Sequence, residues 1–217
     1  MMKQNQLLLA AALVLGATGF SVSAQTPIFT TGPINGTVNA WNLTSGYEEA
    51  SSFTLTDPAT IGNATFGLWV ATGSTLTSVD WAITTSVGGT PLASAAGTVT
   101  PSGTLLTSDN GFGYDIYSES FSIPSIALGA GTYYLQLDNG VTSDSGSAYW
   151  DENDGANSTG YIYDSSAWST LATYSPGSVS LAFSLSGATS VPEPGTLALA
   201  GMGALALGRL ARRRAGK

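Results

Sequence analysis

The side chains best suited to chemistry gather in residues 144–155, which read DSGSAYWDENDG. Calcium in proteins takes several oxygen ligands, and carboxylates on one loop supply them. The stretch holds four candidate calcium ligands: Asp144, Asp151, Glu152 and Asp154. Its spacing is not that of an EF-hand loop, because Gly155 comes one place early and Ile162 stands where the bidentate Glu belongs. The alternative is a solvated acidic loop between strands, in which Asp, Asn and Gly form turns.

Two aromatic residues beside these carboxylates, Tyr149 and Trp150, are candidate glycan contacts. An aromatic ring offers an apolar face on which a sugar can stack, with a polar tip at its edge. Consecutive residues of a strand point to opposite faces, so only one of the two can enter a given core. We expect the other to face outward, where it could bind a glycan. The alternative is that both are core or edge residues.

The inventory of catalytic groups is short, because the sequence between Gln25 and Pro194 contains no Lys, Arg, His or Cys. This removes the imidazole base, the thiolate, the Schiff-base amine and the guanidinium clamp. Paired carboxylates can still hydrolyse a glycosidic bond, and the candidates are Glu48, Glu49, Glu119 and Glu152. Nothing in their spacing places two of them across a cleft, so we expect no catalytic residue and no enzymatic activity.

The body of the chain is purely anionic. Its acidic residues are Glu48, Glu49, Asp57, Asp80, Asp109, Asp115, Glu119, Asp138, Asp144, Asp151, Glu152, Asp154 and Asp164. Such a body repels nucleic acid, so we expect no nucleic-acid partner. Each carboxylate must be solvated, hydrogen-bonded or neutralised by a cation from outside, such as calcium. With no Cys, packing alone must support the fold.

The hydrophobic pattern has a period of two, which is typical of strands with one buried face. The clearest alternating sets are Phe66, Leu68 and Val70; Val79, Trp81 and Ile83; Tyr133, Leu135 and Leu137; and Val179, Leu181, Phe183 and Leu185. A further set, Tyr114, Ile116, Phe121 and Ile123, indicates a change of phase near Ser118. Gly, Asn, Asp and Pro interrupt these runs at short intervals. We therefore predict an all-β fold, an antiparallel, jelly-roll-like β-sandwich over residues 25–186, followed by a flexible linker at 187–190.

The first 24 residues have the pattern of a secretory signal peptide. Lys3 precedes an apolar segment, residues 7–20, which is too short to span a bilayer. Val22 and Ala24 are small residues at the positions that signal peptidase requires, so we expect cleavage between Ala24 and Gln25.

The last 27 residues, 191–217, form a second signal with three parts. Pro192, Glu193 and Pro194 cannot join a helix and stay extended. An apolar segment follows, and residues 196–210 as a helix measure only about 22 Å against a hydrocarbon core of about 30 Å. The basic residues that end the chain favour the cytoplasmic side: Arg209, Arg212, Arg213 and Arg214. Such a short transmembrane helix suits a transient anchor in the inner membrane.

This order of motif, apolar helix and Arg cluster resembles the PEP-CTERM sorting signal of Gram-negative bacteria. The resemblance implies processing by an exosortase, a membrane-embedded cysteine protease or transpeptidase that recognises Pro192, Glu193 and Pro194. It also implies a bacterium that makes exopolysaccharide and biofilm. An ordinary C-terminal tail anchor is the alternative.

Together these features predict an exported protein of the cell surface or extracellular matrix, with a structural or binding role in the envelope or biofilm. The first alternative is a calcium-assisted carbohydrate-binding module for exopolysaccharide. The second is a glycan hydrolase that uses a pair of carboxylates.

Overall fold

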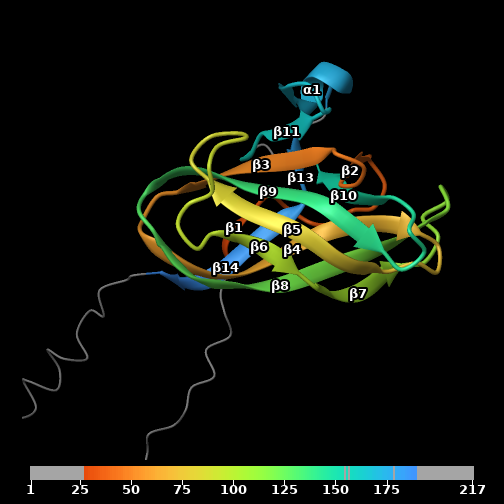
Figure 1. Cartoon of the computed structure of the whole chain (residues 1–217), viewed down its shortest axis with the longest axis horizontal. Helices are drawn as coiled ribbons and strands as arrows, with labels where there is room; N and C mark the ends of the chain where they lie inside the picture. The colour runs from red at the N-terminus through yellow and green to blue at the C-terminus, as the bar shows by residue number, and fades with distance from the viewer. Residues whose placement is uncertain (1–26, 154, 156, 178, 190–217) are drawn as a thin grey trace, which may run out of the picture.

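The computed structural model describes residues 27–153, 155, 157–177 and 179–189, which form two packed antiparallel sheets (Figure 1). The large sheet contains β1 (Pro27–Thr30), β2 (Ala40–Asn42), β4 (Ala59–Ala71), β7 (Ser102–Thr107), β8 (Tyr114–Leu128), β10 (Ala148–Asn153), β13 (Ser180–Leu181) and β14 (Phe183–Thr189). The small sheet contains β3 (Glu48–Leu55), β5 (Leu76–Thr84), β6 (Ala96–Val99), β9 (Gly131–Thr142), β11 (Gly160–Tyr163) and β12 (Trp168–Thr170). The predicted antiparallel β-sandwich is confirmed.

The large sheet is built around the long strands β4 and β8, which pair along the whole of β4. On its other side β4 pairs with β14 over one half and with β10 over the other, while β7 extends the sheet beyond β8. The small sheet runs in the order β12-β11-β3-β9-β5-β6. The chain crosses between the sheets at most connections, from β3 to β4, β4 to β5 and β8 to β9, so strands distant in sequence become neighbours.

Alternating apolar residues from both sheets fill the space between them, as the period of two predicts. Phe66 and Trp150 of the large sheet meet with ring centroids 6.1 Å apart, and Phe53 of the small sheet lies 6.3 Å from Phe183. All four side chains are buried. Because the chain has no cysteine, this interlocked aromatic and aliphatic core is what holds the two sheets together.

Residues 31–39, here called the strap, cover part of the outer face of the large sheet. Gly36, with φ of +66°, lies so close to this face that a Cβ atom would come within 2.7 Å of Ile116. Ile116 is therefore buried although it points away from the core. The predicted change of phase near Ser118 is wrong: β8 pairs with β4 in unbroken register from Tyr114 to Phe121, and Ile116 is apolar because the strap covers it.

The two ends of the described chain lie side by side, because β1 pairs with β14 and Pro27 faces Ser186. The assignment of residues 187–190 to a flexible linker is corrected by this sheet, since Gly187–Thr189 is the last part of β14 and pairs with β4. A Cβ atom at Gly187 would lie 1.9 Å from the Thr60 carbonyl oxygen, so the glycine is needed for a close backbone approach and not for flexibility.

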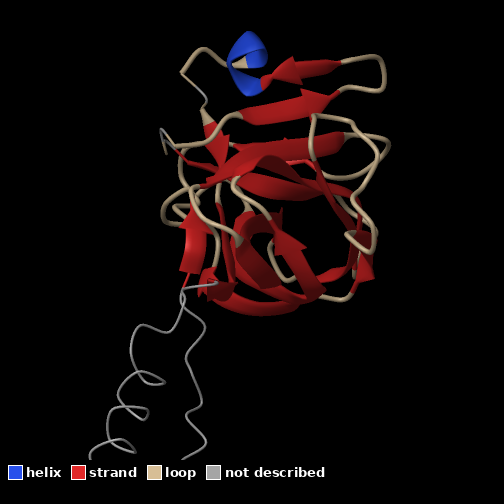
Figure 2. Cartoon of the chain, turned by 90° about the vertical axis from the view of Figure 1, so that its left-hand side faces the viewer, coloured by secondary structure: helices blue, strands red, loops and turns tan. Residues whose placement is uncertain are grey.

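At the opposite side of the sandwich, β11, β12 and the single-turn helix α1 (Leu171–Tyr174) form a small projection (Figures 1 and 2). Leu171 anchors it in the core. None of the helices in the described ranges is long and apolar enough to cross a bilayer. The predicted transmembrane helix at residues 196–210 falls outside the described residues.

Candidate functional site

The residues predicted for export and sorting lie outside the described part of the chain. They are the cleavage residues Ala24 and Gln25, the motif Pro192, Glu193 and Pro194, and the basic residues Arg209, Arg212, Arg213 and Arg214. The candidate sites within the described residues belong to the sandwich.

Strand β10 places the two predicted glycan contacts on opposite faces. Trp150 points into the core, is 0% exposed, and donates its Nε1–H to the Ala182 carbonyl oxygen at 2.9 Å. Tyr149 points outward and is partly exposed. Of the two, only Tyr149 is placed to meet a ligand.

Tyr149 belongs to a group of four rings on the outer face of the large sheet, here called the aromatic patch: Trp69, Phe112, Tyr114 and Tyr149. Tyr114 lies 5.5 Å from Tyr149 and 5.8 Å from Trp69, between ring centroids. Phe112 lies 6.4 Å from Trp69 with the two rings nearly parallel, and it is 68% exposed on the loop before β8. A hydrogen bond with Tyr149 raises the pKa of the Tyr114 hydroxyl. The patch joins an apolar surface to phenolic hydroxyls.

Asp151 faces the same way as Tyr149, but the strap buries it completely. Its carboxylate accepts hydrogen bonds from Trp69 Nε1 at 2.6 Å and from the backbone amides of Asn35 at 3.0 Å and Gly36 at 3.1 Å. Burial raises its pKa to about 6, against the lowering effect of these donors. Asp151 thus fastens the strap to the sheet and orients Trp69, the buried member of the aromatic patch.

The other predicted calcium ligands lie elsewhere. Glu152 points to the core side and accepts a hydrogen bond from Trp41 Nε1 at 2.7 Å. Asp144 lies in the turn before β10, where Ser74, Thr142 and the Gly146 amide donate to it and lower its pKa to about 2. Asp154 is outside the described residues. Among the acidic side chains that the structure describes, no group of three is arranged to hold one metal ion.

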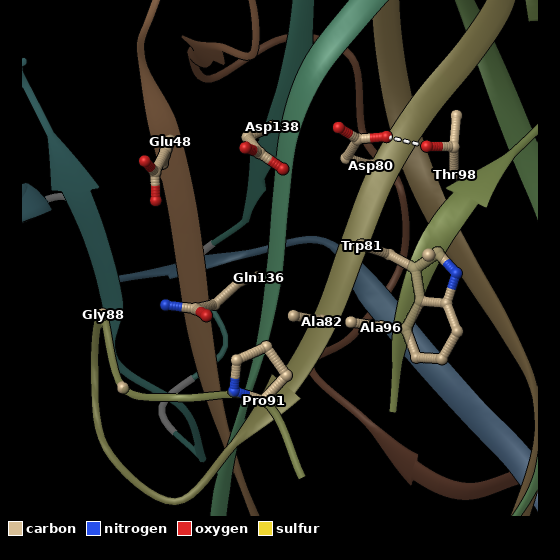
Figure 3. A pocket seen from close by; sticks show the side chains of 12 residues that line it. Glu48, Asp80, Trp81, Ala82, Gly88, Pro91, Ala96, Thr98, Gln136 and Asp138 are labelled. Carbon is tan, nitrogen blue, oxygen red and sulfur yellow. Dashed lines mark hydrogen bonds between the residues drawn. The ribbon is translucent and has the colours of Figure 1, made fainter. Parts of the chain in front are cut away.

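A second candidate site lies on the outer face of the small sheet and was missed from the sequence. Three carboxylates stand in one row across neighbouring strands: Glu48 of β3 faces Asp138 of β9, which faces Asp80 of β5. Thr98 of β6 continues the row and donates its hydroxyl proton to Asp80. Figure 3 shows these four side chains in line. We call this site, with its flanking residues, the acidic groove.

The acidic groove has a volume of about 380 Å³. Its floor contains the small residues Ala82 and Ala96, and Pro91 and Gly88 form its rim (Figure 3). Gly97 also lines it. The loop that carries this rim is tied to β5, because Leu92 N donates to the Ile83 carbonyl oxygen at 2.9 Å. Gly88 has φ of +63° and packs so closely that a Cβ atom would lie 2.2 Å from Trp168 Nε1. These two contacts hold the rim of the acidic groove in place against β5 and Trp168.

The electrostatics of the acidic groove are dominated by like charges. Burial, and then the nearby Glu48 and Asp80, raise the pKa of Asp138 to about 6. The Asn139 amide donates to Asp80 Oδ2 at 2.9 Å and to Asp138 Oδ2 at 3.0 Å. Next to Asp138 in the groove lies Gln136, which is 9% exposed and whose Nε2 has no hydrogen-bond partner.

The four candidate glycosidase carboxylates are distributed over different environments. Glu48 lies in the acidic groove, and Glu152 is bound to Trp41. Glu49 and Glu119 are buried on the core side of their strands, and burial raises the pKa of both, that of Glu119 to about 7. Neither Glu49 nor Glu119 lines the acidic groove.

The local sequence indicated only Asp80 as a residue of the acidic groove. It is an acidic residue at an outward position of the strand whose inward residues are Val79, Trp81 and Ile83. The strands that bring Glu48 and Asp138 beside it are far away in sequence. Periodicity within a strand does not reveal which strands pair.

Comparison with known families identifies a PEP-CTERM protein-sorting motif at residues 190–214. The resemblance drawn from the C-terminal residues is confirmed. The motif marks the chain for export and for processing by an exosortase at a membrane-anchored sorting signal. Comparison with curated proteins finds no match.

Proposed function

We propose that this protein is a surface or extracellular-matrix protein of the bacterial envelope whose sandwich binds a polysaccharide outside the cell. The observation that carries the binding role is the aromatic patch, in which Phe112, Tyr114 and Tyr149 lie at the surface over Trp69. Phe112 is 68% exposed and stacks on Trp69, so an apolar ring face is open to a ligand beside the two tyrosines.

The position of the chain ends supports processing without damage to the fold. β1 begins at Pro27, shortly after the predicted signal-peptide cleavage behind Ala24. β14 ends at Thr189, shortly before Pro192. Because β1 and β14 pair, the two described strands nearest to the predicted cleavage regions lie side by side. Removal of both signals leaves every strand of the two sheets in place.

A sugar ring fits the aromatic patch for a physical reason. The patch offers an apolar ring face at Phe112 and hydroxyl groups at Tyr114 and Tyr149, which matches the apolar faces and hydroxyl rim of a pyranose. The buried hydrogen bond from Trp69 to Asp151 holds the underlying ring in place before any ligand arrives. We assign no catalytic role to Glu49, Glu119 or Glu152, because the first two are enclosed in the core and Glu152 is bonded to Trp41.

Export and processing are tested by fractionating the producing cells and measuring the intact mass of the mature protein. We expect a chain that begins at Gln25 and has lost the Arg-rich end. A mature protein that keeps Arg212, Arg213 and Arg214 would contradict processing at the sorting motif.

Glycan binding is tested with residues 25–190, since every described strand finds its partners within this body. Isothermal titration with exopolysaccharide from the same bacterium should release heat, and Phe112→Ala should weaken binding about fivefold, as expected for about 1 kcal/mol per aromatic contact. Tyr174→Ala, an exposed aromatic on α1, is the matched control and should bind like the wild type. The same titration with a chelator tests the calcium-assisted alternative. An equal loss of affinity in Phe112→Ala and Tyr174→Ala would exclude the aromatic patch as the binding site.

A further inference from the structure

We propose that the acidic groove is a second binding site, separate from the aromatic patch, and that it takes a protonated amino sugar. Three observations carry this assignment: the row of carboxylates, the unpartnered amide of Gln136, and the size and floor of the groove. None of them depends on the aromatic patch, which lies on the other sheet.

The row of three carboxylates has no cationic side chain to neutralise it, so a bound cation would stabilise it. Glu48, Asp138 and Asp80 face one another across three neighbouring strands, and like charges directly opposite each other destabilise a sheet. The donors that reach Asp80 and Asp138 from Thr98 and Asn139 are neutral. No Lys, Arg or His exists between Gln25 and Pro194, so the body cannot neutralise the row itself.

The shape of the row favours an organic cation over a metal ion. Neighbouring strands are about 4.8 Å apart, so the row extends over about 10 Å from β3 to β5. A single calcium ion needs its oxygen ligands at about 2.4 Å. Within the described residues no three acidic groups satisfy that requirement. An ammonium group on a larger molecule can instead lie on one carboxylate while the rest of the molecule follows the row.

Gln136 indicates that the ligand also carries polar oxygen atoms. It lies one position along the strand face from Asp138 and lines the acidic groove, as Figure 3 shows. A buried amide without a hydrogen bond costs about 1–3 kcal/mol, so a native protein rarely keeps one without a reason. A ligand hydroxyl or ring oxygen that pairs with this amide would recover part of that cost. Ammonium and hydroxyl groups on one ring are the chemistry of an amino sugar.

The floor of the acidic groove allows a flat ring to approach. Ala82, Ala96 and Gly97 keep side chains short below the row, and the Pro91 ring forms an apolar edge. The volume of about 380 Å³ lies within the range of small-ligand sites, about 300–1,000 Å³. The groove therefore has room for one or two sugar rings.

The test is isothermal titration of residues 25–190 at pH 7 with three trisaccharides of the same linkage. Their repeating units are glucosamine, N-acetylglucosamine and glucose, of which only the first carries an ammonium group. The glucosamine trimer should bind at least about tenfold more tightly than the other two, because a charged hydrogen bond contributes about 1.5–3 kcal/mol. Asp138→Asn should weaken its binding about tenfold. Asp57→Asn, which removes an equal charge at an exposed position outside the groove, is the matched control and should leave binding unchanged.

Gln136→Leu separates specific recognition from simple charge attraction, because it removes a donor and no charge. It should weaken binding of the glucosamine trimer and leave binding of spermidine, a polyamine without hydroxyls, unchanged. Phe112→Ala should not affect binding at the acidic groove, so a negative result at one site does not contradict the proposal for the other site. Equal binding of spermidine and the glucosamine trimer, heat from calcium that Asp138→Asn abolishes, or equal losses in Asp57→Asn and Asp138→Asn would each overturn the proposal.

Discussion

Replacing Glu49 with methionine should stabilise the sandwich. Glu49 is 0% exposed on the core face of β3, flanked by Leu137 of β9 and Ile162 of β11. Neither of its carboxylate oxygens has a hydrogen-bond partner. Burial therefore raises its pKa well above the ordinary value, which favours the neutral acid in the folded protein. Methionine has a similar length and no polar group to desolvate.

The expected gain has two parts. Removing an unsatisfied buried polar group is worth about 1–3 kcal/mol at any pH. Above the ordinary Glu pKa of 4.5, the unfolded wild type loses a proton that the folded state retains, so wild-type stability falls as pH rises. The slope is about 1.4 kcal/mol per pH unit until the folded-state pKa is passed. The advantage of Glu49→Met should therefore be about 2 kcal/mol at pH 4 and larger at pH 7.

Urea unfolding followed by tryptophan fluorescence at pH 4, 5, 6 and 7 measures this directly, with stability taken from the midpoint at constant slope. Asp57→Met, at an exposed position, is the control and should change stability by less than about 0.5 kcal/mol. A Glu49→Met variant less stable than the wild type, or a difference in stability that does not grow with pH, would show that Glu49 is not a costly buried acid.

Three further predictions concern the whole body and the strap. Wild-type stability should peak at about pH 4 and fall toward pH 7, because burial raises the pKa values of Glu119, Asp138 and Asp151 and their stabilising contribution is lost as the pH rises through these folded-state pKa values. Thermal unfolding followed by circular dichroism across this pH range measures the change, and a stability maximum at pH 7 would contradict it. Asp151→Asn should lower the free energy of unfolding by about 2 kcal/mol, since the NH₂ group of asparagine would face the backbone N–H donors of Asn35 and Gly36. Amide hydrogen exchange at Asn35 and Gly36 should become faster, and unchanged exchange would exclude Asp151 as the anchor of the strap. Gly67→Ala should cost about 1–3 kcal/mol in urea unfolding, because its Cβ would lie 2.6 Å from the Asp151 Cβ and 2.9 Å from Ile34 Cγ2 of the strap. A neutral effect would contradict this close approach of β10 and the strap to β4.

Local patterns were sufficient for much of the fold. Alternation in Val79, Trp81 and Ile83 correctly predicted a strand with its apolar face in the core. The same rule correctly separated Tyr149 from Trp150, because side-chain direction in a strand depends only on the backbone pleat. The pattern was misleading at Ile116, which is apolar on the outward face because the strap covers it.

Residue types and local spacing were sufficient to predict the C-terminal sorting motif, the all-β class and the anionic character of the body. The burial of Asp151 under the strap, the place of Gly187 in a strand, and the row of Glu48, Asp138 and Asp80 became apparent only from the folded sheets. Pairing between distant strands is set by the packing of the two sheets as a whole. Spacing along the chain carries no record of which strands that packing makes neighbours.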